Sequence, residues 1–278
     1  MSLYRDKRVL LASMHQKELA IKEPFEEIVG CKLEVIDNFN TDQFGTFSGE
    51  VERVLTAYET LKQKAVVAAE QYNYDYVISS EGAFGPHPNY LLANSDTEML
   101  LFYDRVNDYF ISDYEISMET NLADFEFDHP NHDYSKFLEK VMFPSHALIL
   151  KADNIVIAKG IKDRATLDQL VAENIHKYGK LKFETDMRAM NNPSRMKIIN
   201  LLANKLAKRV VAHCKKCDVP GFGITSYSGY LLCELCGLPT KIKKYRDYKC
   251  IKCDHIEKEV VDPTAKFADP KYCDFCNP

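Results

Sequence analysis

The chain has 278 residues, of which 46% are hydrophobic and 28% charged, and its formal net charge is −5. This length suits about two domains at roughly 150 residues each, and the composition excludes a fibrous or wholly disordered chain. The acidic balance also argues against a protein that binds nucleic acid with its whole surface.

The sequence shows no targeting or membrane-spanning segment. The apolar run near the N-terminus covers only residues 9–12, which is too short for the core of a signal peptide. No apolar run reaches the roughly 18 residues that a membrane helix needs. We therefore expect a soluble, cytoplasmic protein without a membrane partner.

Strand-like and helix-like segments alternate from the N-terminus. Residues 8–13 form a short apolar run typical of a buried strand. A helix is predicted over 15–29, and residues 32–36 alternate between polar and apolar side chains as a strand does. A loop rich in Asn, Asp, Thr and Gly is predicted over 37–49.

The clearest helix follows this loop. Apolar residues recur every three or four positions and predict one buried stripe, at Val51, Val54, Tyr58, Leu61, Ala65, Ala68 and Tyr72. Asn73 is expected to end the helix. A strand is then predicted over 76–80, followed by the segment Glu81-Gly-Ala-Phe-Gly-Pro-His-Pro88.

The remaining elements complete an α/β pattern. Two antiparallel strands are predicted over 99–103 and 109–118, and a hairpin over 147–158. Helices are predicted over 164–178 and 192–210, and the second opens with a capping Asn followed by Pro. The alternation predicts an α/β fold with a mixed central sheet and flanking helices.

Charge and cysteine content both change near residue 210. Residues 1–209 carry 25 basic and 32 acidic side chains, whereas residues 210–278 carry 11 and 9. Eight of the nine cysteines fall in the second part, and Cys31 is expected to be a core residue rather than a nucleophile. We place an α/β domain over 1–212 and a small cysteine-rich module over 213–278.

The cysteines of this module form four Cys-x-x-Cys pairs, Cys214/Cys217, Cys233/Cys236, Cys250/Cys253 and Cys273/Cys276. Each such turn directs two thiolates at one metal ion, so four pairs predict two four-cysteine zinc sites in a double ribbon. Disulfides do not suit a protein without a secretion signal, and a redox motif is normally single. The zinc ions would be structural, because closed sites keep no open position, and would stabilise a module this small.

The spacing leaves open which pairs share an ion. Sequential pairing joins the first pair to the second and the third to the fourth. Nested pairing joins the second to the third and the first to the fourth. Residues 236–239 and 248–250 resemble the two halves of one ribbon, which favours the nested arrangement.

A basic stretch lies between the pairs of cysteines. Residues 241–252 hold six basic side chains interleaved with Tyr245 and Tyr248. Phosphate contacts combined with base stacking would use such a stretch. The other interpretation is a solvated face whose charge keeps the ribbon soluble.

Three segments of the larger domain could form one site: 13–17, 59–65 and 79–82. In open α/β sheets, ligands bind outside the carboxyl ends of strands. Lys17 would hold a phosphate there, and Glu59 and Glu81 could share a Mg²⁺ ion, which prefers carboxylate oxygens. The alternative for Glu59 is a solvated position on the flank of its helix.

These segments carry a family resemblance. The order of Lys17, then Glu-x-x-x-x-Lys-Ala over 59–65, then Glu81-Gly82 resembles the inosine/xanthosine triphosphate pyrophosphatase superfamily. The likeness covers residues 8–90 and continues beyond them only in outline. It implies an α/β fold that cleaves off-type nucleoside triphosphates to monophosphate and pyrophosphate with Mg²⁺.

The resemblance also implies roles for single residues. Lys17 would bind phosphate, Glu59 would bind the metal ion, Glu81 would be a metal ligand or base, and Lys64 would face the triphosphate. The whole chain is more closely similar to an uncharacterised bacterial domain-of-unknown-function family with four C-terminal Cys-x-x-Cys pairs. That second resemblance implies no activity.

Two further residues are candidates for substrate contact. Arg188 closes the segment Glu184-Thr-Asp186-Met-Arg188 and could clamp a phosphate, although a salt-bridge cluster between domains is the alternative. His87 could recognise a base or transfer a proton, or it could be a partly buried polar residue.

Two functional hypotheses follow from these residues. The first is a Mg²⁺-dependent hydrolase of a nucleoside triphosphate or a related phosphorylated small molecule, with structural zinc sites. The second is a catalytically silent platform whose zinc module binds nucleic acid, through residues 241–252, or a protein partner. In a third interpretation, the module only braces the fold or an oligomer.

Overall fold

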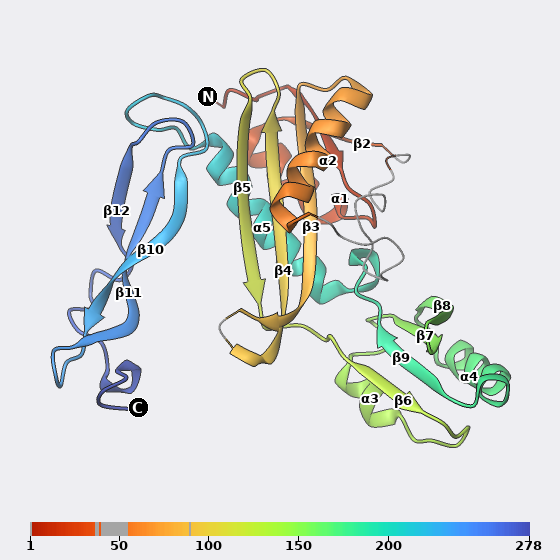
Figure 1. Cartoon of the computed structure of the whole chain (residues 1–278). Coiled ribbons are helices and arrows are strands. Elements are labelled where there is room, and N and C mark those ends of the chain that lie inside the picture. The colour runs from red at the N-terminus through yellow and green to blue at the C-terminus, as the bar shows by residue number, and fades with distance from the viewer. Residues whose placement is uncertain (1, 37–38, 40–54, 89) are drawn as a thin grey trace. The chain divides into compact units, whose positions relative to one another are not determined.

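The computed structural model describes residues 2–36, 39, 55–88 and 90–278. These residues form two compact units, essentially Leu3–Leu206 and Ala207–Pro278 (Figure 1). The border between the units falls inside a long helix, a few residues before the boundary that the cysteine content suggests. Within the described part of the chain, no helix is both long and apolar enough to cross a membrane.

A five-stranded sheet in the order β2-β1-β3-β4-β5 is the centre of the first unit. Its strands are β1 (Arg8–Ala12), β2 (Lys32–Val35), β3 (Tyr76–His87), β4 (Tyr90–Asp104) and β5 (Tyr109–Ser117). β1 pairs in parallel with β2 and β3, whereas β3 with β4 and β4 with β5 pair antiparallel. The mixed α/β sheet predicted from the sequence is therefore confirmed.

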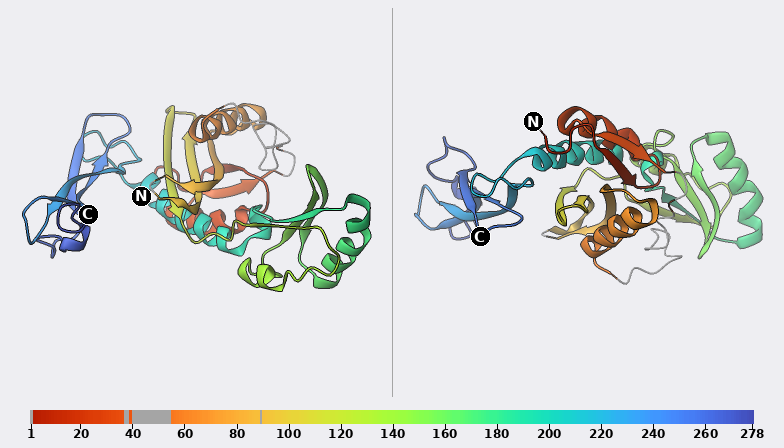
Figure 2. Two further views of the ribbon diagram at one scale, coloured as in Figure 1. Left: turned by 60° about the horizontal axis from the view of Figure 1, so that its bottom comes forward. Right: turned by 90° about the horizontal axis from the view of Figure 1, so that it is seen from above.

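Helices cover both faces of this sheet (Figure 2). One face carries α1 (Glu18–Pro24), which continues into a π-helical turn over Phe25–Val29, and α5 (Pro193–Val211). The other face carries α2 (Ala57–Tyr72). The side-chain amide of Asn200 in α5 donates a 2.9 Å hydrogen bond to the carbonyl of Ala20 in α1. This bond links α1 to α5 on the same face of the sheet.

The core between α2 and the sheet follows from the predicted apolar stripe. Leu61, Ala65 and Ala68 of α2 are fully buried and pack against Leu10 of β1 and Val77 of β3. Burial of each leucine or valine side chain contributes about 1.5–3 kcal/mol to the stability of the fold. The stripe begins later than its first residues suggest, because Tyr58 is 40% exposed.

A smaller antiparallel sheet in the order β6-β9-β7-β8 completes the first unit. Its elements are β6 (Asp124–Phe127), α3 (Ser135–Lys140), β7 (Leu148–Ala152), β8 (Ile155–Ile161), α4 (Arg164–Tyr178) and β9 (Leu181–Thr185). Phe127, Leu150 and Phe183 lie in its core with Leu167 and Val171 of α4. The predicted hairpin over 147–158 is present as β7 and β8.

The second unit contains the end of α5 and a three-stranded antiparallel sheet in the order β10-β11-β12. Its strands are β10 (Gly223–Leu232), β11 (Pro239–Lys249) and β12 (Ile256–Val260). A Cys-x-x-Cys pair follows each of the first two strands directly, and another precedes β10. The cysteines therefore lie at the ends of the sheet.

One strand of the first unit is longer than the sequence predicts. β3 extends to His87 instead of ending near Ser80, because it forms a long hairpin with β4. Glu81 consequently lies inside a strand rather than after its last residue. The loop predicted over 37–49 falls, apart from Phe39, outside the described residues, as do Val51 and Val54 of the predicted helix.

Candidate functional site

The eight cysteines of the second unit form two groups of four. One group is Cys214, Cys217, Cys250 and Cys253, and the other is Cys233, Cys236, Cys273 and Cys276. Within each group all four sulfur atoms lie within 4.8 Å of one another. The shortest sulfur–sulfur distances between pairs are 3.6 Å in both groups, from Cys217 to Cys250 and from Cys236 to Cys273.

This grouping corrects the sequence expectation about pairing. The first pair joins the third and the second joins the fourth, so both the nested arrangement and the sequential one are wrong. The sheet explains the result. The start of β10 lies beside the end of β11, where Gly223 pairs with Lys249, and the end of β10 lies beside the start of β11. Consecutive pairs therefore lie at opposite ends of the sheet.

The geometry of the sulfur atoms fits zinc. A tetrahedral ion with Zn–S bonds of about 2.3 Å separates its sulfur ligands by about 3.8 Å, close to the observed spacing. Backbone amides of Lys252 and Cys253 donate to the sulfur of Cys250 at 3.3 and 3.4 Å. Burial opposes ionisation of Cys250, but these amides and the thiols of Cys217 and Cys253 together lower the pKa of its thiol to about 7. The two groups can thus hold two zinc ions.

A second candidate site lies in the first unit, where β1 ends beside β3. The connection after β1 runs to β2, whereas the connection after β3 runs to β4 on the other side. In open α/β sheets such a switch point is where ligands bind. Ala12 pairs with Ser79, so Ser80, Glu81 and Gly82 lie beyond the end of β1.

On the α2 side of the sheet, Lys64 and Glu81 form an ion pair. Both side chains are about 95% buried, with exposures of 6% and 5%. Lys64 was expected to face a triphosphate, and Glu81 to bind a metal ion or act as base. The structure pairs the two side chains with each other, and both expected roles stay predictions.

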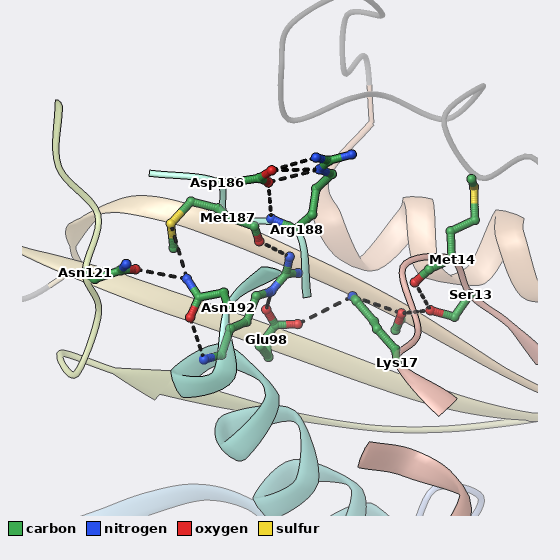
Figure 3. Close-up of polar contacts among 11 residues, drawn as sticks. Ser13, Met14, Lys17, Glu98, Asn121, Asp186, Met187, Arg188 and Asn192 are labelled. Carbon is green, nitrogen blue, oxygen red and sulfur yellow. Dashed lines mark hydrogen bonds and ion pairs between the residues drawn. The ribbon is translucent and has the colours of Figure 1, made fainter. Parts of the chain in front are cut away.

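On the opposite side, Glu98 of β4 lies between two cations, as Figure 3 shows for Lys17. Its carboxylate accepts a hydrogen bond from the Nε of Arg195 and lies 3.6 Å from the Nζ of Lys17. The Nζ of Lys17 also donates to the hydroxyl of Ser80 at 3.1 Å. Glu98 and Arg195 are each only 1% exposed, so this pair is fully desolvated.

Lys17, Asp96, Glu98 and Arg195 form a buried charged cluster. The charges and the burial of this cluster shift several pKa values. Burial lowers the pKa of Lys17 to about 8, against the stabilising charge of Glu98. Burial and the neighbouring Glu98 raise the pKa of Asp96 to about 8. Burial opposes ionisation of Glu98, but Arg195 and Lys17 outweigh it and lower its pKa. The cluster therefore contains two groups that can exchange protons near neutral pH.

Asparagines and a second ion pair surround Arg195. The amide of Asn192 donates to Asn121 at 2.9 Å (Figure 3). The side chain of Arg195 donates to the carbonyl of Met187. Seven positions before Arg195, Arg188 binds the buried Asp186 at 2.6 Å. The guanidinium of Arg188 is thus bound to a carboxylate of the protein, and its role as a substrate clamp stays a prediction.

Two predicted residues lie away from the cluster. Glu59 is exposed and closes a capping box, in which its carboxylate accepts from the backbone of Thr56 at 3.0 Å. Glu59 and Lys64 are five positions apart in the helix, so their side chains point about 140° apart around its axis. Lys64 faces Glu81, and Glu59 therefore points away from it. His87 is six residues beyond Glu81 along β3, about 20 Å away at 3.3 Å per residue. The structure therefore does not bring Glu59 or His87 to Glu81, and their predicted roles stay predictions.

Three residues of the cluster were not predicted as site residues, namely Asp96, Glu98 and Arg195. A sequence signal existed for the first two. They are two acids at alternate positions directly before the apolar run 99–103, so they share one face of a strand that continues into the core. Arg195 has no such signal, because its role depends on contacts with residues far away in the chain.

A family model described as "Domain of unknown function (DUF6671)" matches residues 64–278. No curated protein matches the chain. Among solved structures, protein VC0702 from Vibrio cholerae is similar at 12% identity, over 40% of this chain and 63% of that one, so this chain spans less than two thirds of its length. The TM-score of 0.27 is too low to support an inference.

These matches confirm the resemblance to a family of unknown function. They do not show the resemblance to the inosine/xanthosine triphosphate pyrophosphatases, which stays an expectation from the sequence.

Proposed function

Because the chain belongs to the DUF6671 family, whose description assigns no activity, we propose a function from the geometry alone. The first unit is a Mg²⁺-dependent hydrolase of a nucleoside triphosphate or a related phosphorylated small molecule. The second unit holds two structural zinc ions. The buried charged cluster at the switch point between β1 and β3 carries this proposal.

The cluster is poorly explained as a stabilising feature. Buried ion pairs are often no better for stability than apolar side chains of the same volume, because desolvating both charges is costly. Here Lys17, Glu98 and Arg195 are all at least 95% buried. Groups with shifted pKa values that gather at a ligand-binding position of the fold are candidates for function.

The side chains suit a phosphorylated ligand. Lys17 and Arg195 can hold phosphate oxygens, and releasing them from Glu98 would free that carboxylate. The Oδ1 atom of Asp96 is buried and has no hydrogen-bond partner among the described residues. Mg²⁺ prefers such carboxylate oxygens together with substrate phosphates.

The proposed reaction is attack by water on a phosphorus atom, with cleavage of the bond to the leaving phosphate. A bound Mg²⁺ would neutralise the charge that develops on the phosphate oxygens. Lys17 and Arg195 would orient the same oxygens. Asp96, whose pKa lies near 8, would accept the proton of the attacking water when ionised.

A hydrolysis screen tests the proposal. Purified protein is incubated with nucleoside triphosphates, and then with other phosphate esters, in Mg²⁺ or Mn²⁺, and the phosphate or pyrophosphate released is measured. We expect a wild-type activity that falls at least 100-fold in Glu98→Gln and Asp96→Asn. Folding of each variant is checked by urea denaturation.

Glu59→Gln is the matched control, because the structure gives this exposed residue a capping role. It should keep the wild-type rate. Absence of hydrolysis of every phosphate ester by the wild type would contradict the proposal. Full activity in a folded Glu98→Gln variant would contradict the assignment of the site.

A further inference from the structure

The sheet of the second unit has two chemically different faces. Successive residues of a strand point to opposite faces, and cross-strand partners share a face. One face, called the Tyr245 face below, carries Ser226, Ser228, Tyr230, Lys243, Tyr245, Asp247, Lys249 and Lys258. The opposite face carries Tyr227, Arg246, Tyr248, Glu257 and Glu259, whereas the Nζ of Lys244 lies 5.3 Å from the ring centre of Tyr245. The basic stretch 241–252 is thus divided between two surfaces.

The opposite face is electrically balanced. Both of its acids are paired with a cation, Glu259 with Arg246 at 3.6 Å and Glu257 with Lys215 at 2.8 Å. The hydroxyl of Tyr248 donates to the carboxylate of Glu259 at 2.7 Å. This face offers no excess charge to a polyanion.

The Tyr245 face is basic. Its three lysines stand against one acid, Asp247, which is only 6% exposed and lies 3.8 Å from the Nζ of Lys258, so the face keeps two lysines in excess. The hydroxyls of Ser226 and Ser228 donate to Asp247 at 3.1 and 2.7 Å. The negative charge is therefore held beneath the surface, and the lysines dominate the exposed part of the face.

The same face presents aromatic rings beside the lysines. Tyr230 is 48% exposed, and the Nζ of Lys243 lies 3.9 Å from the centre of its ring. The Nζ of Lys258 lies 5.7 Å from the ring centre of Tyr245. Gly229 lies against the Tyr245 ring, where an added Cβ would come within 3.0 Å of it. The glycine therefore lets this ring pack closely against β10.

We propose that the Tyr245 face binds single-stranded nucleic acid. The tyrosine rings stack on unpaired bases, and Lys243, Lys249 and Lys258 contact the phosphates between them. A duplex fits less well, because its bases are already stacked on one another. This function is independent of the hydrolase proposed for the first unit.

Fluorescence anisotropy tests the proposal with the full-length, zinc-loaded protein. The probes are 5′-labelled 15-mers of single-stranded RNA and DNA, with a duplex of the same length as competitor. We expect the Lys243→Gln/Lys258→Gln variant to raise the Kd at least tenfold and to reduce the slope of log K against log salt by about 1.4, at 0.7 per lost contact. Tyr230→Ala should raise the Kd about 5- to 150-fold through lost stacking.

The control removes the same charge by replacing the two cations that pair with the acids of the opposite face. Lys215→Gln/Arg246→Gln should leave the Kd within twofold of wild type, and the zinc content of every variant is measured to confirm folding. Tighter binding of either RNA or DNA supports the proposal and identifies the natural partner. No binding at 100 µM wild-type protein overturns it, as does an equal loss in the two double variants or tighter binding of the duplex.

Discussion

At the scale of single residues, Gly82 determines how closely Arg195 can approach Glu98. A Cβ at this position would lie 2.4 Å from the guanidinium of Arg195 and 2.7 Å from the carboxylate of Glu98. Both groups are buried and hydrogen-bonded, so neither can move away cheaply. The Glu-Gly dipeptide of the sequence thus has a packing reason beyond backbone freedom.

We expect Gly82→Ala to lower the free energy of unfolding by about 1–3 kcal/mol, the usual cost of overpacking a buried site. Urea denaturation measures this difference. Gly85→Ala is the control in the same strand, because an added Cβ there meets no described atom within 4 Å. Equal effects of the two substitutions would show that strand propensity, and not the crowding of Arg195, sets the cost.

Asp96 gives the protein a distinctive dependence on pH. Its pKa is raised to about 8 in the folded state, against 3.8 for an unperturbed Asp carboxyl, so between these two pH values the folded state binds more protons than the unfolded state. The free energy of unfolding should therefore fall as pH rises from about 4 to about 8. Burial lowers the pKa of Lys17 to about 8. The folded state therefore binds fewer protons at Lys17 than the unfolded state above pH 8, and only there does Lys17 make the free energy of unfolding rise with pH.

The Asp96→Asn variant isolates this contribution. Its side chain cannot titrate, so its urea midpoint should fall less than that of the wild type between pH 5.5 and pH 7.5. His146, whose pKa is lowered by burial, titrates in both proteins, and its effect cancels in the comparison. Parallel pH profiles would mean that Asp96 is ionised in the folded state throughout this range.

At the scale of elements, local signals in the sequence predict most helices and strands correctly. The apolar stripe that includes Leu61 and the Asn-Pro start of α5 depend only on neighbouring residues. The cluster could not be predicted in the same way. Arg195 and Glu98 are 97 positions apart, and their contact depends on the length of β4 and the direction of α5.

The start of α2 depends on a reciprocal capping box between Thr56 and Glu59. We expect Thr56→Ala to lower the free energy of unfolding by about 0.5–2 kcal/mol, because one amide of the first turn loses its acceptor. Glu59→Ala should also destabilise the protein. Since both variants break the same box, the double variant should cost less than the sum of the two. Additive costs in urea denaturation would show that the two bonds act separately.

At the scale of the whole molecule, the chain combines a unit with buried charges and a unit organised by cysteines. The number of cysteine pairs predicts two metal sites, but not which pairs meet. A strand of ten residues such as β10 spans about 33 Å, so the pairs at its two ends cannot share one ion. Recognising residues 223–249 as two long strands would have excluded sequential and nested pairing.

Metal content distinguishes the three pairings directly. In the observed arrangement, changing Cys214, Cys217, Cys250 and Cys253 to Ser removes one complete site and leaves the other intact. The zinc content should then fall from two ions per chain to one, as measured by inductively coupled plasma mass spectrometry. Sequential or nested pairing would place two of these cysteines in each site, and the variant would then lose both ions.

A complementary variant completes the argument. Replacing Cys214, Cys217, Cys233 and Cys236 takes two ligands from each observed group, so it should abolish tight zinc binding, although it removes the same number of cysteines. Because four thiolates at one ion supply much of the folding energy of a small module, this variant should also lose the β10-β11-β12 sheet, whereas the first should keep it beside the remaining site. Retention of one tightly bound ion by the second variant would contradict the crossed pairing.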